Sequence, residues 1–294
     1  MTIFTGSGVA LVTPFTSDGI DYERLKDLIE WHIKEGTDAI IVSGTTGEAS
    51  TLSKKEKEEL FDFTVQTVGG RIPVIAGTGG NNTEEVVSLS QYAEKVGVDG
   101  LLLVTPYYNR TTQQGLIAHF QTVADRVGIP IILYNVPART GVNIKPETVY
   151  TLSLHPNIVG IKEASGNIGQ VAKIASLVGP DFAIYSGNDD SILPVLALGG
   201  KGVISVLANI CPKATHLMVT YYLNGQIEEA KKLQLTYLPL IEALFIENNP
   251  IPVKTAMRLI GRDAGPLRLP LVPMGEENEA KLKQVLKQFN LIAE

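Results

Sequence analysis

Short hydrophobic runs rich in β-branched residues recur along most of the chain, separated by segments with a helical pattern of apolar residues. The runs show little polar alternation, which is typical of parallel strands that helices cover on the outside. Eight such alternations predict an α/β protein with a (β/α)8 TIM barrel, with an open doubly wound sheet as the alternative. The expected strands lie near Val9, Ile40, Val74, Leu101, Ile131, Val159, Ala183 and Val203.

Helix boundary signals stand between the expected strands. Residues 53–56 (Ser-Lys-Lys-Glu) form a capping box, in which the first and last side chains satisfy free backbone N–H groups. Pro146 and Pro212 suit a first helical turn, and Gly36 and Gly97 suit helix ends. These signals support helices that alternate with the strands.

The strand pattern stops at Gly225, and only helical patterns follow. Two proline-containing stretches, residues 248–252 and 265–273, interrupt them, because proline lacks an N–H donor and restricts the residue before it. We therefore expect a barrel over residues 1–225 and a C-terminal helical segment over residues 226–294, packed on the barrel or on a neighbouring subunit. The expected helices cover about 226–247, 253–261 and 275–290.

Composition narrows the classes of function. A net charge of −6 with no Lys/Arg-rich run argues against a nucleic-acid partner. The apolar run at residues 9–12 is too short for a secretion signal, and no run approaches the roughly 18 residues of a membrane span. The single cysteine, Cys211, excludes an intramolecular disulfide and fits a cytoplasmic protein, and the four histidines show no metal-binding spacing. We expect no metal.

Lys162 lies in an apolar, strand-like run, residues 158–165, where an ammonium group has no obvious structural purpose. Loss of water disfavours the charged form of a lysine, and a neutral amine can attack a ketone. The alternative is a lysine at a strand end that reaches solvent or pairs with Glu163. Side chains alternate between the faces of a strand, so Lys162 shares a face with Ile158 and Gly160, and Tyr134 on the neighbouring strand would meet it.

Other candidate residues follow expected strands, where barrel enzymes carry their active sites. In residues 44–48 (Gly-Thr-Thr-Gly-Glu) two hydroxyl groups stand beside glycines, a pattern that suits a small carboxylate and equally suits a plain turn. Tyr108, Tyr134 and Arg139 follow or end neighbouring strands; tyrosines can pass protons and arginine can bind a carboxylate through two hydrogen bonds. Taken singly, the tyrosines suit packing and Arg139 suits the surface. Asp189 and Asp190 suit acid–base catalysis or helix capping.

Together these motifs resemble the dihydrodipicolinate synthases, which belong to the pyruvate-dependent class I aldolase family that includes N-acetylneuraminate lyase. The resemblance covers essentially the whole chain, and Arg-Thr-Gly at 139–141 is similar to the synthases rather than to the lyases. The motifs that carry it are residues 44–48, 105–108, 134–141, 160–163 and 249–254.

The resemblance implies that Lys162 forms an imine with pyruvate. The derived enamine would condense with L-aspartate 4-semialdehyde to give 4-hydroxy-tetrahydrodipicolinate, in lysine and diaminopimelate biosynthesis. No added cofactor is implied. The implied roles are a proton relay (Tyr134, Thr45 and, from an adjacent subunit of a homotetramer, Tyr108), carboxylate binding (Thr46 for pyruvate, Arg139 for the semialdehyde) and backbone lining of the site (Gly187, Ile204).

The resemblance also implies an allosteric lysine pocket. Family members that lysine inhibits usually carry histidine or glutamate where this chain has Lys57, and often histidine at Lys54. Two cations would repel an ammonium ligand, so we expect weak or absent lysine inhibition; the alternative is that both lysines only solvate a helix. The remaining candidate positions of this pocket are Ala49, Asn81, Glu85 and Tyr107.

Two other functions stay open at this point. An aldolase for a sugar-derived 2-keto acid such as N-acetylneuraminate would share the lysine and pyruvate chemistry but accept a different aldehyde. A non-catalytic keto-acid sensor would bind pyruvate without turnover.

Overall fold

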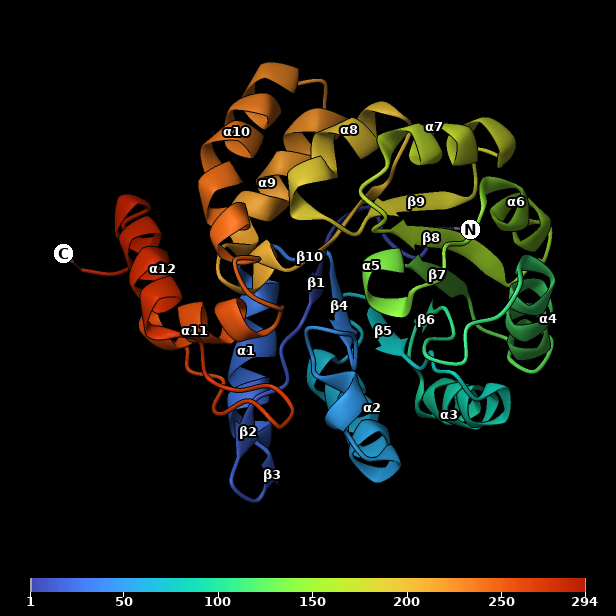
Figure 1. The fold of residues 1–294 in the computed structure, drawn as a ribbon, viewed down its shortest axis with the longest axis horizontal. Coiled ribbons are helices and arrows are strands. Elements are labelled where there is room, and N and C mark those ends of the chain that lie inside the picture. Colours follow the sequence, from blue (N-terminus) through green and yellow to red (C-terminus); the bar gives the residue numbers. More distant parts are fainter. Residues whose placement is uncertain (1, 294) are drawn as a thin grey trace.

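Eight parallel strands close into a barrel in the computed structural model, which describes residues 2–293. Each strand pairs with the next one around the barrel, and β1 closes the ring by pairing with both β4 and β10 (Figure 1). The predicted barrel is confirmed, and each expected strand coincides with an observed one. The strands are β1 (Gly6–Ala10), β4 (Ala39–Val42), β5 (Val74–Gly77), β6 (Gly100–Val104), β7 (Ile131–Asn135), β8 (Ile158–Glu163), β9 (Ala183–Ser186) and β10 (Gly202–Ser205).

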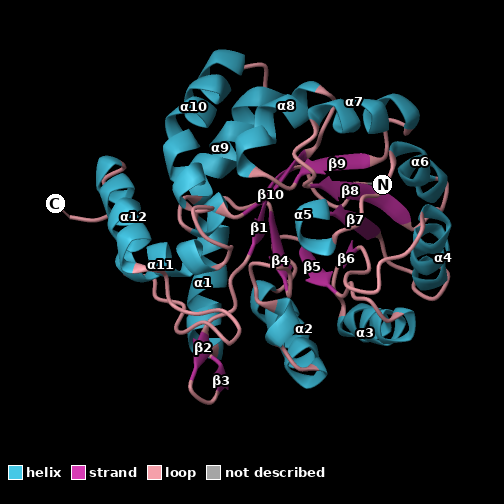
Figure 2. Cartoon of the chain, in the orientation of Figure 1, coloured by secondary structure: helices cyan, strands magenta, loops and turns pink. Residues whose placement is uncertain are grey.

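Helices surround the strands on the outside (Figure 2), and a short hairpin of β2 (Phe15–Thr16) and β3 (Gly19–Ile20) follows β1. The predicted capping box is confirmed: Ser53 and Glu56 each accept a hydrogen bond from the backbone N–H of the other. Gly97 ends its helix with a left-handed φ of 89°. The helices of the barrel are α1 (Tyr22–Lys34), α2 (Lys54–Val68), α3 (Thr83–Val96), α4 (Gln113–Ala124), α5 (Pro137–Thr140), α6 (Pro146–Ser153), α7 (Ile168–Leu177), α8 (Ile192–Ala197) and α9 (Pro212–Leu223).

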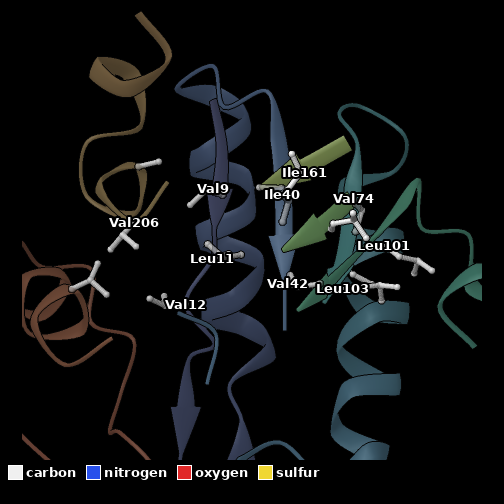
Figure 3. Packing of buried hydrophobic residues seen from close by; sticks show 14 of the residues in the cluster. Val9, Leu11, Val12, Ile40, Val42, Val74, Leu101, Leu103, Ile161 and Val206 are labelled. Carbon is white, nitrogen blue, oxygen red and sulfur yellow. The ribbon is translucent and has the colours of Figure 1, made fainter. Parts of the chain in front are cut away.

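Hydrophobic side chains form two layers, which explains why the strand sequences show so little polar alternation. Ile40 and Val42 of β4 pack outward between strands and helices, as Figure 3 shows, whereas Ile41 between them belongs to the cluster inside the barrel. Inside the barrel, Tyr185 stacks on Phe4 with ring centroids 4.4 Å apart, and its hydroxyl donates to the Phe4 carbonyl (2.6 Å). Both faces of a barrel strand are therefore buried.

The C-terminal helices α10 (Ile227–Ala243), α11 (Ile251–Leu259) and α12 (Glu276–Gln288) overlap the three predicted segments. Leu240, Val253 and Leu282 of these helices join the same outer hydrophobic cluster as the barrel strands. In Figure 1 α11 lies beside α12, and α10 lies beside α9. No helix among residues 2–293 is long and apolar enough to cross a membrane.

Strands β7 and β8 pair with an irregular register. Ile131 pairs with Ile158, but the next residue of β7, Ile132, pairs with Gly160. This bulge shifts the alternation of side chains, so Ile158 packs in the outer cluster, and the prediction that it shares a face with Lys162 is wrong. Position 160 requires glycine, because a Cβ there would lie 2.6 Å from the carbonyl oxygen of Ala183 on the neighbouring strand β9.

Candidate active site

Lys162 and Tyr134 meet inside the carboxyl end of the barrel, as predicted. They are directly paired across β8 and β7, and each is only 6% exposed. The Nζ atom of Lys162 lies 4.3 Å from the centre of the Tyr134 ring. A cation is attracted to the face of an aromatic ring, so this contact positions the amine next to the tyrosine.

The adjacent carboxylate, Glu163, does not serve as the partner of Lys162. It points to the other face of β8, where Gln170 donates to Oε2 (2.8 Å), Asn135 donates to the same atom (3.1 Å) and the backbone N–H of Ser165 donates to Oε1 (2.6 Å). These bonds tie the ends of β7 and β8 to the start of α7. The buried carboxylate is thereby satisfied without Lys162, which removes the ion-pair interpretation based on Glu163.

The loop after β4 carries the two threonines in a constrained conformation. Ser43 and Glu48, at the two ends of the loop, have left-handed φ angles of 56° and 54°. Such angles cost energy in residues other than glycine and persist only where the surroundings enforce them. Here the hydroxyl of Thr13 donates to the carbonyl of Gly47 (2.7 Å), and Lys254 Nζ donates to Glu48 Oε1 (2.7 Å).

A pocket of about 280 Å³ opens at this end of the barrel. Its walls come from β5, β6 and β7, from the loops that follow β4 to β7, and from α2 and α5. It brings together the predicted site residues Thr45, Tyr134 and Arg139. Lys162, Thr46, Gly187 and Ile204 are not in its walls. The lining residues are Ser43, Gly44, Thr45, Ala49, Ser50, Lys57, Gly77, Gly79, Leu102, Val104, Tyr107, Tyr134, Val136, Arg139 and Thr140.

Gly187 directly follows β9, and Ile204 lies on β10. The N–H of Gly187 donates to the carbonyl of Glu163 (2.8 Å), which continues the pairing of β9 with β8. Ile204 is fully buried in β10 and belongs to the same inner cluster as Tyr134. Both positions therefore lie around the barrel interior that holds Lys162.

Thr46 and Arg139 share a contact that sequence reasoning missed. Thr46 is buried, and its Oγ1 accepts a hydrogen bond from Asn249 Nδ2 (3.0 Å). Arg139 Nη2 donates to the backbone carbonyl of the same Asn249 (3.2 Å). The available signal was the proline-containing motif at residues 249–254, which indicated a helix break and contributed to the family resemblance but did not point to a contact with Thr46 or Arg139.

Tyr108 stands apart from the other candidates. Its side chain is 93% exposed, and its φ of 69° is left-handed, which is unusual for a bulky residue. The loop around it is nevertheless held, because Asn81 donates to the carbonyl of Tyr107 (3.1 Å) and accepts from Asn109 (2.9 Å). Within one chain, Tyr108 does not line the pocket, whereas Tyr107 does.

The candidate allosteric residues divide into those that line the pocket and those that do not. Lys57 is half-buried in the pocket wall, where burial lowers the pKa of its ammonium group and the charge of Glu85 opposes that shift. Lys54 is exposed, donates to Ser88 Oγ of α3 (2.9 Å) and does not line the pocket. Ala49 lines the pocket beside Lys57.

Asp189 is a buried carboxylate near Lys162. Its Oδ2 accepts from the N–H groups of Val206 (3.0 Å) and Leu207 (2.8 Å), at the turn that follows β10. Burial raises its pKa, and the backbone donors and the Lys162 charge oppose that rise. Asp189 therefore caps the turn that follows β10, and not the helix α8 that follows it in the sequence. Among residues 2–293, no cluster of His, Cys, Asp or Glu side chains is placed to hold a metal ion.

The closed barrel and the pocket at its carboxyl end define a (β/α)8-barrel enzyme. The model of the Dihydrodipicolinate synthetase family matches residues 3–289, and the chain belongs to that family. The 4-hydroxy-tetrahydrodipicolinate synthase of a Thermoanaerobacter species is 60% identical over 100% of this chain and 99% of its own length. The predicted resemblance is confirmed.

Solved structures agree with this assignment. The dihydrodipicolinate synthase of Aquifex aeolicus superposes with a TM-score of 0.96 at 48% identity, covering 98% of this chain and 99% of that one. The enzyme of Cyanidioschyzon merolae, solved with lysine bound, has a TM-score of 0.96 at 43% identity and covers 99% and 100% of the two chains.

Proposed function

We propose that this enzyme condenses pyruvate with L-aspartate 4-semialdehyde to give 4-hydroxy-tetrahydrodipicolinate, in the pathway to diaminopimelate and lysine. The observation that carries the proposal is the buried Lys162 amine against Tyr134, next to a pocket that also presents Thr45 and Arg139. The similarity to 4-hydroxy-tetrahydrodipicolinate synthases over the full chain supports this substrate pair over a sugar-derived aldehyde.

The chemistry follows from an amine in a largely water-free site. Lys162 Nζ adds to the ketone carbon of pyruvate, and the ketone oxygen leaves as water, which gives an imine. Loss of a methyl proton yields an enamine, whose carbon attacks the aldehyde of the semialdehyde and forms the new C–C bond. The substrate amine then attacks the imine carbon and expels Lys162. The net reaction releases one water.

The neighbouring side chains supply protons and bind the two carboxylates. Tyr134 and Thr45 pass protons between the reacting groups, completed by Tyr108 of an adjacent subunit. Thr46 donates to the carboxylate of pyruvate, and Arg139 binds the carboxylate of the semialdehyde. The backbone at Gly187 and Ile204 lines the site.

Borohydride trapping tests the nucleophile. Reduction in the presence of pyruvate should leave an adduct on Lys162, located by peptide mass spectrometry. Lys162→Arg should abolish the adduct, whereas Lys173→Arg, at an exposed position on α7, should leave it unchanged. Turnover with aspartate semialdehyde, but not with sugar-derived aldehydes, identifies the second substrate. An adduct on another lysine would contradict the proposal.

We further propose a homotetramer, organised as a dimer of dimers, in which each subunit completes the site of another. The exposed side chain of Tyr108, which does not line the pocket of its own chain, supports this exchange of residues between subunits. Mixed oligomers test this arrangement: inactive Lys162→Arg and Tyr108→Ala subunits should recover activity when reassembled together, because some sites receive both intact residues. No recovery in verified mixed oligomers would contradict it. The proposed pathway places the enzyme in the cytoplasm, and we retain residue 225 as the proposed boundary between barrel and C-terminal segment.

A further inference from the structure

Asn249 connects the C-terminal segment to the candidate active site. It lies between α10 and α11, in the loop that the sequence marks with prolines, and only 5% of it is exposed. Its side chain contacts Thr46, 203 residues away in the sequence, and its carbonyl contacts Arg139, 110 residues away. Asn249 therefore contacts both Thr46 and Arg139, the two side chains that bind the substrate carboxylates in the proposed function.

The direction of the Asn249–Thr46 hydrogen bond has a chemical consequence. A threonine hydroxyl has one hydrogen to donate and can accept two bonds. Because Asn249 Nδ2 is the donor in this contact, Thr46 Oγ1 accepts, and its own hydrogen stays available for a carboxylate. If the amide were reversed, Thr46 would donate to Asn249 and would have no hydrogen left for pyruvate.

The loop that carries Asn249 is itself held in place. The N–H of Ile251 donates to the carbonyl of Asn248 (2.9 Å), and that of Lys254 donates to the carbonyl of Pro250 (3.0 Å), which starts α11. Lys254 then reaches Glu48, two residues from Thr46, through a buried ion pair. The loop after β4 and the start of α11 are thus joined at two points.

We propose that Asn249 is a positioning residue for substrate binding, an inference that rests on the proposed function. Its side-chain amide holds Thr46 so that the hydroxyl hydrogen points to the pyruvate carboxylate. Its backbone carbonyl holds the guanidinium of Arg139 for the second substrate. The C-terminal segment therefore takes part in setting affinity, although it contributes no reacting group.

Asn249→Asp tests the inference because it keeps the shape and reverses the hydrogen bond. A carboxylate only accepts, so it takes the Thr46 hydrogen and places a negative charge beside the pyruvate carboxylate. We expect KM for pyruvate to rise at least about tenfold, the fold-change typical of losing a hydrogen bond to a charged group. The kcat and the KM for the semialdehyde should change less than about threefold on the same scale, because the Asn249 carbonyl remains.

The controls separate positioning from general damage. Asn248→Asp makes the same charge change at the adjacent exposed residue and should leave KM for pyruvate unchanged. In a Thr46→Val background, Asn249→Asp should add little further to that KM, because the hydroxyl it acts through is gone. If Asn249→Asp does not fold, Asn249→Ala, which adds no charge, should still raise KM for pyruvate about threefold or more.

Three results would overturn the inference: equal KM values in the Asn248 and Asn249 variants, a loss confined to kcat, or full additivity with Thr46→Val. Trapping distinguishes this failure from failure of the proposed function. If wild-type enzyme forms no pyruvate adduct on Lys162, the proposed function is wrong. If it does, and half-maximal trapping needs the same pyruvate concentration in both Asp variants, only the positioning role is wrong.

Discussion

Lys254→Met should destabilise the protein strongly, because Lys254 neutralises a carboxylate that has no access to water. The side chains of Lys254 and Glu48 are 3% and 0% exposed, and their charged atoms are 2.7 Å apart. Lys254 also donates to the carbonyl of Pro266 (2.8 Å) and lies over the ring of Phe15, with Nζ 4.5 Å from its centre. Methionine keeps the apolar stem but removes the charge and both hydrogen bonds.

The magnitude follows from the charge that is left behind. Removing one partner of a buried ion pair typically costs about 3–5 kcal/mol, since the remaining charge is buried and uncompensated. Glu48 would keep only the backbone N–H of Arg268 (2.9 Å) as a donor. Replacing both partners removes that charge, so Glu48→Gln combined with Lys254→Met should recover about 2 kcal/mol or more of the loss.

Urea unfolding followed by Trp31 fluorescence measures the effect, with all variants at one protein concentration, because the apparent stability of an oligomer depends on protein concentration. Lys281→Met is the matched control: its ion pair with Glu277 has the same 2.7 Å separation, but the two side chains are 52% and 84% exposed. That control should lose no more than about 1 kcal/mol. A loss for Lys254→Met as small as the control, or a double variant less stable than the single one, would refute the reasoning.

Three further predictions concern ligands and pH. L-Lysine should inhibit weakly or not at all in a turnover assay, and Lys57→Gln should strengthen its inhibition; strong inhibition of the unmodified enzyme by sub-millimolar lysine would contradict this. Burial lowers the pKa of His32 to about 3 and of His119 to about 4, so the unfolded chain binds protons that the folded one does not. The free energy of unfolding should therefore fall as the pH is lowered from 6.5 to 4, by up to about 1.4 kcal/mol per pH unit for each histidine. In a pH series of unfolding curves, the free energy of unfolding of His119→Gln should depend less steeply on pH. Asp38, 2.8 Å from His216 Nδ1, raises the pKa of that histidine. The contribution of His216 to the free energy of unfolding is therefore present in full below about pH 6.5 and is lost as pH rises through the raised pKa. His216→Asn should destabilise the protein more at pH 6 than at pH 9.

The part of the site that sequence reasoning predicted depends on local regularity. The strands repeat apolar residues on both faces, and the pairing of Tyr134 with Lys162 follows from alternation within two neighbouring strands. The same reasoning was wrong for Ile158, because a bulge adds one residue to β8 and shifts everything before it to the other face. Nothing in the apolar run Ile-Val-Gly marks which residue is the extra one.

Contacts between distant segments could not be predicted from the sequence for a different reason. The prolines around Asn249 predicted a break between helices, but its amide could meet any loop on the same rim of the barrel, and only the fold selects Thr46. The ion pair of Glu163 with Lys162 could have been rejected from the sequence, because alternation along a strand sends adjacent side chains to opposite faces. The actual partners of Glu163, Gln170 and Asn135, come from other segments, and only the fold selects them.

The two links between the loop after β4 and α11 also explain how that loop keeps its strained conformation. The left-handed φ of Glu48 is unfavourable in isolation, and the buried ion pair with Lys254 offsets it by fixing the side chain. That same anchor leaves Thr46 facing Asn249, whose loop begins the helix that carries Lys254. Folding of the C-terminal segment and alignment of Thr46 are therefore coupled, since neither contact forms unless α11 is docked on the barrel.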